Sequence, residues 1–146
     1  MRRSLIEVKH AIADGEDVNA FDKARRTPLF YAAKYGDAAV VSELILHGAD
    51  INHQDDGLKT ALHFAASSYQ PDVVEILLNN GAEVDAQDSH GNTPLSDAVF
   101  DSKGRGGVIK CLLSFGANKA KKNKHGVSPE ELAKTIGNYD IASFLS

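Results

Sequence analysis

Residues 60–66 read Thr60-Ala61-Leu62-His63-Phe64-Ala65-Ala66, and three other stretches of the chain repeat this pattern. The stretch Thr27-Pro28-Leu29-Phe30-Tyr31-Ala32-Ala33 precedes it, and Thr93-Pro94-Leu95-Ser96-Asp97-Ala98-Val99 follows it at the same spacing. A weaker copy, Ser128-Pro129-Glu130-Glu131-Leu132-Ala133, begins slightly more than one further period along the chain. Self-similarity at a fixed period of roughly 33 residues indicates a repeat architecture.

Each repeated unit carries start and stop signals for two helices. Threonine and serine are favourable N-caps, and the proline that follows in three of the four units is tolerated at the first helical position. Apolar runs then predict a second helix through residues 40–46, 73–78 and 108–113. A Gly-Ala pair ends each run, at Gly48, Gly81 and Gly116, where glycine can adopt the left-handed conformation that closes a helix.

The period and the Thr-Pro-Leu-His-like opening resemble those of ankyrin repeats over the whole chain. The resemblance implies an all-α ankyrin-repeat solenoid of helix-turn-helix repeats, with β-turn or hairpin fingers and a capping half-repeat at each end. We assign one domain, residues 1–146, with full repeats at 22–54, 55–87 and 88–122. Residues 1–21 form the N-terminal cap, with a helix over 5–13, and residues 123–146 form the C-terminal capping repeat, with a short last helix over 140–145. A single unit cannot bury its apolar face, so the leucines and paired valines must pack against neighbouring units.

Departures from the pattern point to function, because the matching positions mostly serve packing. The turn before each threonine has glycine in the family, yet Arg25 and Leu58 stand there in the first two full repeats. The family's histidine is present only as His63, and the resemblance implies that its ring bonds the start of the helix. The third repeat has two extra residues within Ser102–Gly107, between its two helices.

Composition narrows the class of protein. The 146 residues are 42% hydrophobic and carry a net charge of -4, and no apolar run approaches the roughly 20 residues that cross a bilayer. We therefore expect neither a membrane protein nor a nucleic-acid-binding one. Glu7 and Lys9 interrupt any signal-peptide-like segment, and one cysteine, Cys111, suits a reducing compartment. We expect a cytoplasmic protein that is monomeric on its own.

Candidate chemical groups do not form a catalytic or ligand-binding pattern. The six histidines lack metal-ligand spacing, so we expect no metal, cofactor or catalytic site. The glycines of Lys103–Gly107 lack the order of a phosphate loop and indicate a flexible insertion or, alternatively, a partner contact. Asp97 and Asp101 share a helical face and suit a polar position on a binding surface better than an acid/base pair. The basic run 119–125 is best interpreted as a solvated hairpin. A contact to an acidic partner is the second interpretation, and binding to nucleic acid is the third.

Stacked repeats of this kind bind partners through an extended concave surface. By register with the family, the fingertips are Phe21, Lys23, Arg25, Arg26, Gln54, Asp56, Lys59, Gln87, Ser89, His90, Asn92, Lys124 and His125. The palm positions, at the end of each first helix, are Lys34, Tyr35, Ser67, Ser68, Tyr69, Phe100 and Asp101. Tyr35, Tyr69 and Phe100 recur at similar places and suggest an aromatic row, or a cover for the helix ends.

These observations favour a non-catalytic protein-binding module. Since the chain consists of repeats and caps, we expect binding itself to be its action, with inhibition by occlusion as the result. The length and the ending 125–133 with Ile136-Gly137-Asn138-Tyr139-Asp140 resemble small stand-alone bacterial ankyrin proteins, some of which are immunity proteins that neutralise a toxin encoded beside them. The main alternative is a scaffold or adaptor that binds without inhibiting. Ankyrin inhibitors of cyclin-dependent kinases are of similar size and are another type that acts by occlusion. A small enzyme is the remaining class of function.

Overall fold

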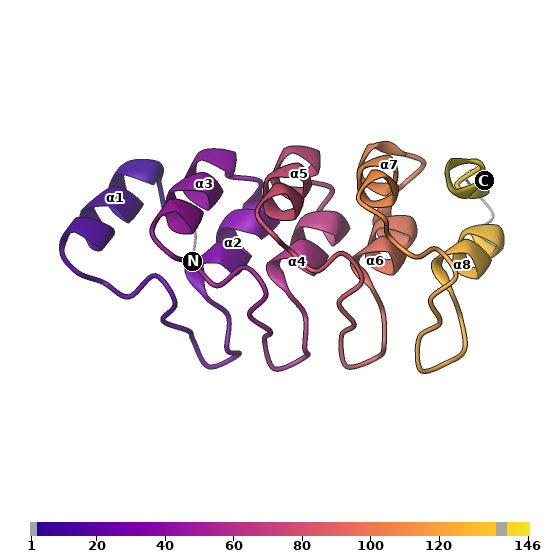
Figure 1. Ribbon diagram of the computed structural model, residues 1–146, viewed down its shortest axis with the longest axis horizontal. Coiled ribbons are helices and arrows are strands. Elements are labelled where there is room, and N and C mark those ends of the chain that lie inside the picture. The colour runs from indigo at the N-terminus through magenta and orange to yellow at the C-terminus, as the bar shows by residue number, and fades with distance from the viewer. Residues whose placement is uncertain (1–2, 137–139) are drawn as a thin grey trace.

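The computed structural model describes residues 3–136 and 140–146, which form two rows of helices above a row of loops (Figure 1). The inner row, in which each helix follows a loop, consists of α2 (Pro28–Tyr35), α4 (Ala61–Ser67), α6 (Pro94–Asp101) and α8 (Pro129–Thr135). The outer row consists of α1 (Leu5–Ala13), α3 (Ala38–Leu46), α5 (Pro71–Asn79), α7 (Gly107–Ser114) and the 3-10 helix η1 (Ala142–Leu145). Each helix packs against the next one in its own row, and the two rows pack against each other. The expected all-helical solenoid is confirmed in the part of the chain that the structure describes.

The inner helices begin where the repeated motif predicts. The hydroxyl groups of Thr60, Thr93 and Ser128 each accept a hydrogen bond from the backbone N–H three residues later. Thr27 makes no such side-chain bond, although α2 still begins at Pro28. The proline fixes a helical φ at that position, so the helix start does not depend on the threonine hydroxyl there.

The outer helices end at the expected glycines. Gly48, Gly81 and Gly116 have φ of +88°, +92° and +88°, the left-handed region in which glycine carries no steric penalty. The alanine after each glycine donates its N–H to a carbonyl of the last helical turn, at 3.0 to 3.1 Å. This bond closes the helix and returns the chain toward the next loop.

The core runs without interruption through the stack. Leu29, Leu62 and Leu95 are at most 1% exposed, and Val73 and Val74 are fully buried between the rows. Each of these leucines contributes on the order of 2 kcal/mol through burial of its side chain. Because the buried faces belong to successive units, stability is shared between neighbours, as in other solenoids.

Asparagine side chains join each outer turn to the next. Asn19 donates to the carbonyl of Gly48 at 3.0 Å and accepts from the N–H of Asp50 at 2.7 Å. Asn52 repeats both bonds one unit later, to Gly81 and Glu83. At the third equivalent position Asp85 accepts from the N–H of Asn118 at 2.9 Å, but a carboxylate has no hydrogen to donate.

Asp85→Asn should therefore stabilise the protein by restoring the missing donor. We expect the free energy of unfolding in urea to rise by about 1 kcal/mol, the typical net value of one hydrogen bond. Asp50→Asn removes the same charge without adding this bond and serves as the control. An equal gain in Asp50→Asn would assign the effect to charge instead.

The two ends are capped differently. At the N-terminus Ser4 and Glu7 form a reciprocal capping box on α1, which occupies the expected residues 5–13. At the C-terminus the expected helix over residues 140–145 is instead the shorter 3-10 helix η1. Residues 137–139, part of the ending that carries the family resemblance, lie outside the described residues. No helix in the described part has the length and apolar character needed to span a bilayer.

Candidate partner-binding surface

Four finger loops project from the inner row, and the same turn forms the tip of each (Figure 1). Each turn opens with Asp22, Asp55, Asp88 or Asn123, whose carbonyl accepts from the N–H three residues later at 2.9 to 3.0 Å. The side-chain oxygen of the same residue accepts from the N–H groups two and four residues later, at 2.9 to 3.0 Å. These local bonds hold each finger in a fixed shape.

Backbone hydrogen bonds connect the fingers to one another. The N–H groups of Asp56, Ser89 and Lys124 donate to the preceding finger, at Ala24, Gly57 and His90, over 2.8 to 3.0 Å. The tips of the fingers therefore lie side by side in one continuous row along the stack. A surface fixed by backbone bonds loses little conformational freedom when a partner binds.

Two fingertips contain side chains at a backbone position that favours glycine. Arg25 and Leu58 have φ of +61° and +60°, and the equivalent residues Gly91 and Gly126 have φ of +77° and +76°. A left-handed backbone costs a residue with a Cβ roughly 1–2 kcal/mol. Strain of this kind is typical of functional positions, which makes these two side chains candidates for recognition.

Arg25→Gly should therefore stabilise the fold. The Arg25 side chain is exposed and loses little packing, so we expect the free energy of unfolding to rise by about 1 kcal/mol. Lys23→Gly, at an exposed neighbour whose φ is not left-handed, should lower it by about 0.5–1 kcal/mol. Denaturant unfolding of both variants distinguishes strain relief from a general effect of glycine in this finger.

An exposed aromatic and cationic patch lies around Arg25. Its guanidinium lies 5.2 Å from the centre of the Phe21 ring, and Phe21, which is 56% exposed, stacks on His53 at 5.9 Å. The His53 Nε2 is 2.8 Å from the carbonyl oxygen of Arg25, which ties the first finger to the second. Beside this patch lies a hollow of about 500 Å³ with a mainly polar lining, which consists of Arg25, Asp50, Asn52, His53, Gln54, Asp55, Asp56 and Leu58. Arginine and aromatic side chains are the ones that most often carry the binding energy of a protein interface.

Two other predicted fingertip residues, Arg26 and Lys59, hold neighbouring units together. The Arg26 Nε is 3.1 Å from a carboxylate oxygen of Asp55, and its guanidinium lies 4.9 Å from the centre of the Phe64 ring. Lys59 makes the equivalent contacts one unit later, with Asp88 at 3.1 Å and Asp97 at 3.0 Å. Each cation thus bridges the finger and the inner helix of the following unit.

Burial shifts the pKa values of the groups around Lys59. Burial lowers the pKa of the lysine, but Asp97 and Asp88 together raise it above its usual range. Burial raises the pKa of Asp97 above its ordinary value even though the ammonium of Lys59 lowers it. Asp88 is also buried, yet the N–H of Asn92 and the Lys59 ammonium keep its pKa below normal. The cluster is a partly buried ion-pair network rather than an exposed binding position.

His63 completes the same cluster. Its Nδ1 accepts from the N–H of Thr60 at 3.1 Å, and its Nε2 lies 2.9 Å from the carbonyl oxygen of Asn92 in the next unit. The ring is therefore protonated on Nε2, and burial holds its pKa below the usual value. The role implied by the family resemblance is confirmed, since the ring bonds the start of α4.

The cluster brings together groups that could in principle hold a metal ion. His63, Asp88 and Asp97 each offer a ligand atom within 4.8 Å of the others. However, the Lys59 ammonium bonds both carboxylates, and both ring nitrogens of His63 are engaged with other groups of the chain. The donor set fits an internal ion pair better than a metal site.

The palm residues differ in how far they are available. Phe100 is 70% exposed and Tyr35 42% exposed, at the ends of α6 and α2. Lys34 is exposed, and its Nζ lies 5.9 Å from the centre of the Tyr35 ring. Asp101 is half-buried, which raises the pKa of its carboxyl group. The remaining palm residues, all half-buried, are Ser67, Ser68 and Tyr69.

Tyr69 is held by the insertion of the third repeat. The Arg105 guanidinium lies 3.8 Å from the centre of the Tyr69 ring, and the Tyr69 hydroxyl accepts from the N–H of Gly107 at 3.2 Å. Arg105 also donates to the carbonyl of Ser102 at 2.9 Å. The insertion thus contacts the preceding repeat across the helix ends. For Tyr69, this arrangement favours the interpretation that the ring covers a helix end over the interpretation that it belongs to an aromatic row.

The last two fingers provide fewer free side chains. Gln87 donates to the carbonyls of Gly91 and Lys122, at 2.8 and 3.3 Å, and the Asn92 amide oxygen accepts from Asn123 at 2.9 Å. Ser89 is half-buried, whereas the side chains of His90, Lys124 and His125 are exposed. Exposed predicted residues on the first two fingers are Phe21, Lys23, Arg25, Gln54 and Asp56.

Sequence reasoning missed His53 and Leu58 as candidate binding residues. His53 stands where the other units have Ala20, Ala86 and Lys121, so its ring is unusual for the position. Leu58 stands where the family has glycine, but it was not among the residues predicted to form the binding surface. Comparing each residue with its equivalents in the other units would have found both.

Comparison with known families gives a match to a model described as Ankyrin repeats (3 copies), at residues 4–88 and 29–123. No curated protein matches the chain.

Proposed function

The chain belongs to the ankyrin-repeat family, and from this premise we propose that it is a non-catalytic module that binds a partner protein and inhibits it by occlusion. Ankyrin repeats are protein-protein interaction modules, so binding of a protein is the function of the family as a whole. The finer proposal is that the concave face and fingers cover a functional surface of the partner. An immunity protein that neutralises a cognate toxin in the cytoplasm is the form of this function that we favour.

The observation that carries the proposal is the placement of Arg25 and Leu58. Both side chains stand at fingertips where glycine would avoid left-handed strain, and both line the same hollow. Neither is buried, since Arg25 is exposed and Leu58 is 45% exposed, so packing within the chain does not account for the strain. A contact with a partner supplies the reason for retaining them.

The residues around the hollow suit a protein partner. Phe21 and Leu58 offer apolar area, and Arg25 can form paired hydrogen bonds with a carboxylate. Asp56 lines the hollow and Lys23 lies on the same finger as Arg25, and mixed charge favours one specific protein surface over a polyanion. We therefore propose that the first two fingers form the centre of the interface, with Lys34, Tyr35 and Phe100 on the palm at its edge.

Co-expression with the product of a neighbouring gene tests the proposal. We expect the two proteins to co-purify and this protein to abolish the growth defect that the partner causes alone. The double variant Phe21→Ala with Arg25→Gly should lose both effects, while Phe115→Ala, an exposed aromatic of the outer row, should retain them. A stable complex with an unimpaired partner would favour the scaffold alternative, and harmless expression of the partner alone would contradict the immunity role.

A further inference from the structure

The inner row of helices starts one unit later than the outer row (Figure 1). α2 packs against α4, α4 against α6, and α6 against α8, so every later inner helix has a preceding inner helix beside it. In the described part of the chain, which begins at Arg3, α1 is the only helix before α2, and it belongs to the outer row. Among the described residues, the flank of α2 that faces away from α4 therefore has no helix of the inner row against it.

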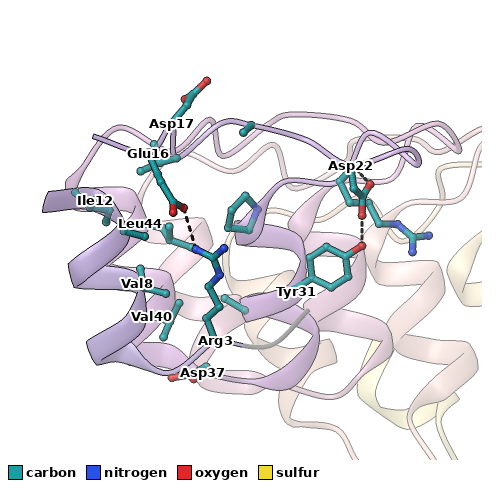
Figure 2. Close-up of a pocket in the computed structure, with 16 residues that line it drawn as sticks. Arg3, Val8, Ile12, Glu16, Asp17, Asp22, Tyr31, Asp37, Val40 and Leu44 are labelled. Carbon is teal, nitrogen blue, oxygen red and sulfur yellow. Dashed lines mark hydrogen bonds and ion pairs between the residues drawn. The ribbon is translucent and has the colours of Figure 1, made fainter. Parts of the chain in front are cut away.

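A cavity occupies this place. It has a volume of about 420 Å³, and the side chains of Val8, Ile12, Ala32, Val40 and Leu44 form its apolar part. Figure 2 shows the side chains of α1 and α3 pointing into it from one side and Tyr31 from the other. Since a water molecule occupies about 30 Å³ in the liquid, the cavity is far larger than a packing defect.

An exposed ion pair crosses the opening. In Figure 2 the Arg3 side chain extends across the cavity toward Glu16, and the two side chains meet at 2.9 Å. They are 44% and 58% exposed, and ion pairs exposed to this degree are weakly held. To displace Arg3, a ligand therefore needs to break only this exposed ion pair, which costs little free energy.

The rim of the cavity is acidic. It includes the carboxyl groups of Glu16, Asp17, Asp22 and Asp37, against the two guanidinium groups of Arg3 and Arg26. Arg3 is paired with Glu16 and Arg26 with Asp55, so the excess negative charge of the rim comes from Asp17, Asp22 and Asp37. The net charge of the rim therefore favours a cationic occupant.

We propose that this cavity is a docking site for a short amphipathic helix of a partner protein, with apolar side chains on one face and lysine or arginine beside them. The helix would take the place of the inner helix that precedes each later unit, and short helices such as α2 and α4 fill those equivalent places. The site lies at the N-terminal end of the stack, apart from the hollow between the first two fingertips. It is a second interaction surface, and its occupation does not depend on the proposed inhibition.

Binding of synthetic peptides to the full chain tests the proposal. The first probe is a fluorescein-labelled helical peptide with leucine and alanine on one face and lysine on the other, and the second has glutamate in place of lysine. Fluorescence anisotropy should give a dissociation constant at least about tenfold lower for the lysine peptide. Equal binding of both peptides, or binding of neither, would overturn the proposal.

Variants locate the binding to the cavity. Ala11→Phe places a ring in the cavity and should weaken binding of the lysine peptide about tenfold or more. Ala39→Phe, on the exposed surface of α3, should leave this binding unchanged. Thermal unfolding of both variants checks that each is folded. Glu16→Gln with Asp37→Asn should reduce the preference for the lysine peptide, and Asp14→Asn, outside the cavity, should not. Equal effects of the paired variants, or a dimer in sedimentation that Ala11→Phe dissociates, would contradict a partner helix as the occupant.

Discussion

Replacement of His63 by alanine is expected to lower the free energy of unfolding by about 4 kcal/mol. The imidazole is fully buried and joins two units through the N–H of Thr60 and the carbonyl of Asn92. Alanine leaves a cavity and removes the partner of both backbone groups. Urea unfolding monitored by circular dichroism measures the loss.

A conservative variant separates the capping role from the packing role. Glutamine at this position can accept from the N–H of Thr60, as in a capping box, but does not fill the space of the ring in the same way. We expect His63→Gln to recover more than half of the loss caused by alanine. Equal destabilisation by both variants would mean that the bond to Thr60 contributes little.

The buried imidazole should also make stability depend on pH. Burial places the pKa of folded His63 below the 6.5 of the unfolded chain, so the unfolded state binds more protons between the two values. The stabilising contribution is complete above about pH 6.5 and decreases as the pH falls below it, by at most about 1.4 kcal/mol per pH unit. His63→Gln should remove this part of the pH dependence, and an unchanged slope would contradict the assignment.

Replacement of Lys59 by alanine is expected to destabilise the fold by about 3 kcal/mol, near the lower end of the cost of removing one member of a buried ion pair. The lower end applies because 34% of the Lys59 side chain is exposed and water can reach it. The side chains of Asp88 and Asp97 are only 1% and 14% exposed, so their carboxylates would lose their counterion in a buried place. Denaturant unfolding at neutral pH measures the effect.

A double replacement tests whether register explains this cluster. Lys59→Arg with Asp97→Phe reproduces the preceding junction, in which Arg26 bonds Asp55 and lies over Phe64. We expect the free energy of unfolding of the double variant to lie within about 1 kcal/mol of that of the natural protein. Asp97→Phe alone should lower this free energy by more. Additive losses from the two single changes would show that the two junctions are not equivalent.

Local signals in the sequence were sufficient for most of the fold. Thr60 and the prolines at the first helical positions set the starts of the inner helices, and Gly48 and its equivalents set the ends of the outer ones. These signals act within a few residues, so their outcome does not depend on distant contacts. The predicted last helix was too long because the apolar residues of 140–145 do not reveal that only a short 3-10 helix forms.

The candidate surface was harder to predict because it depends on contacts between units. Arg26 and Lys59 have the charge and loop position of exposed fingertip residues, yet each bonds an aspartate in the finger of the next unit. Tyr69 was assigned to the palm, and nothing in its neighbours revealed that Arg105, in the insertion, would lie on its ring. Conversely, the departures from glycine at Arg25 and Leu58 were visible, but their left-handed φ values were needed to show strain.

Arg25 and Leu58 keep a strained backbone because both contact the partner, and the double variant Arg25→Gly with Leu58→Gly tests this role. Calorimetric titration of the partner against this variant is combined with unfolding of the free variant. We expect the variant to be more stable than the natural protein and to bind its partner at least about tenfold more weakly. A variant that gains stability and binds with unchanged affinity would contradict this role.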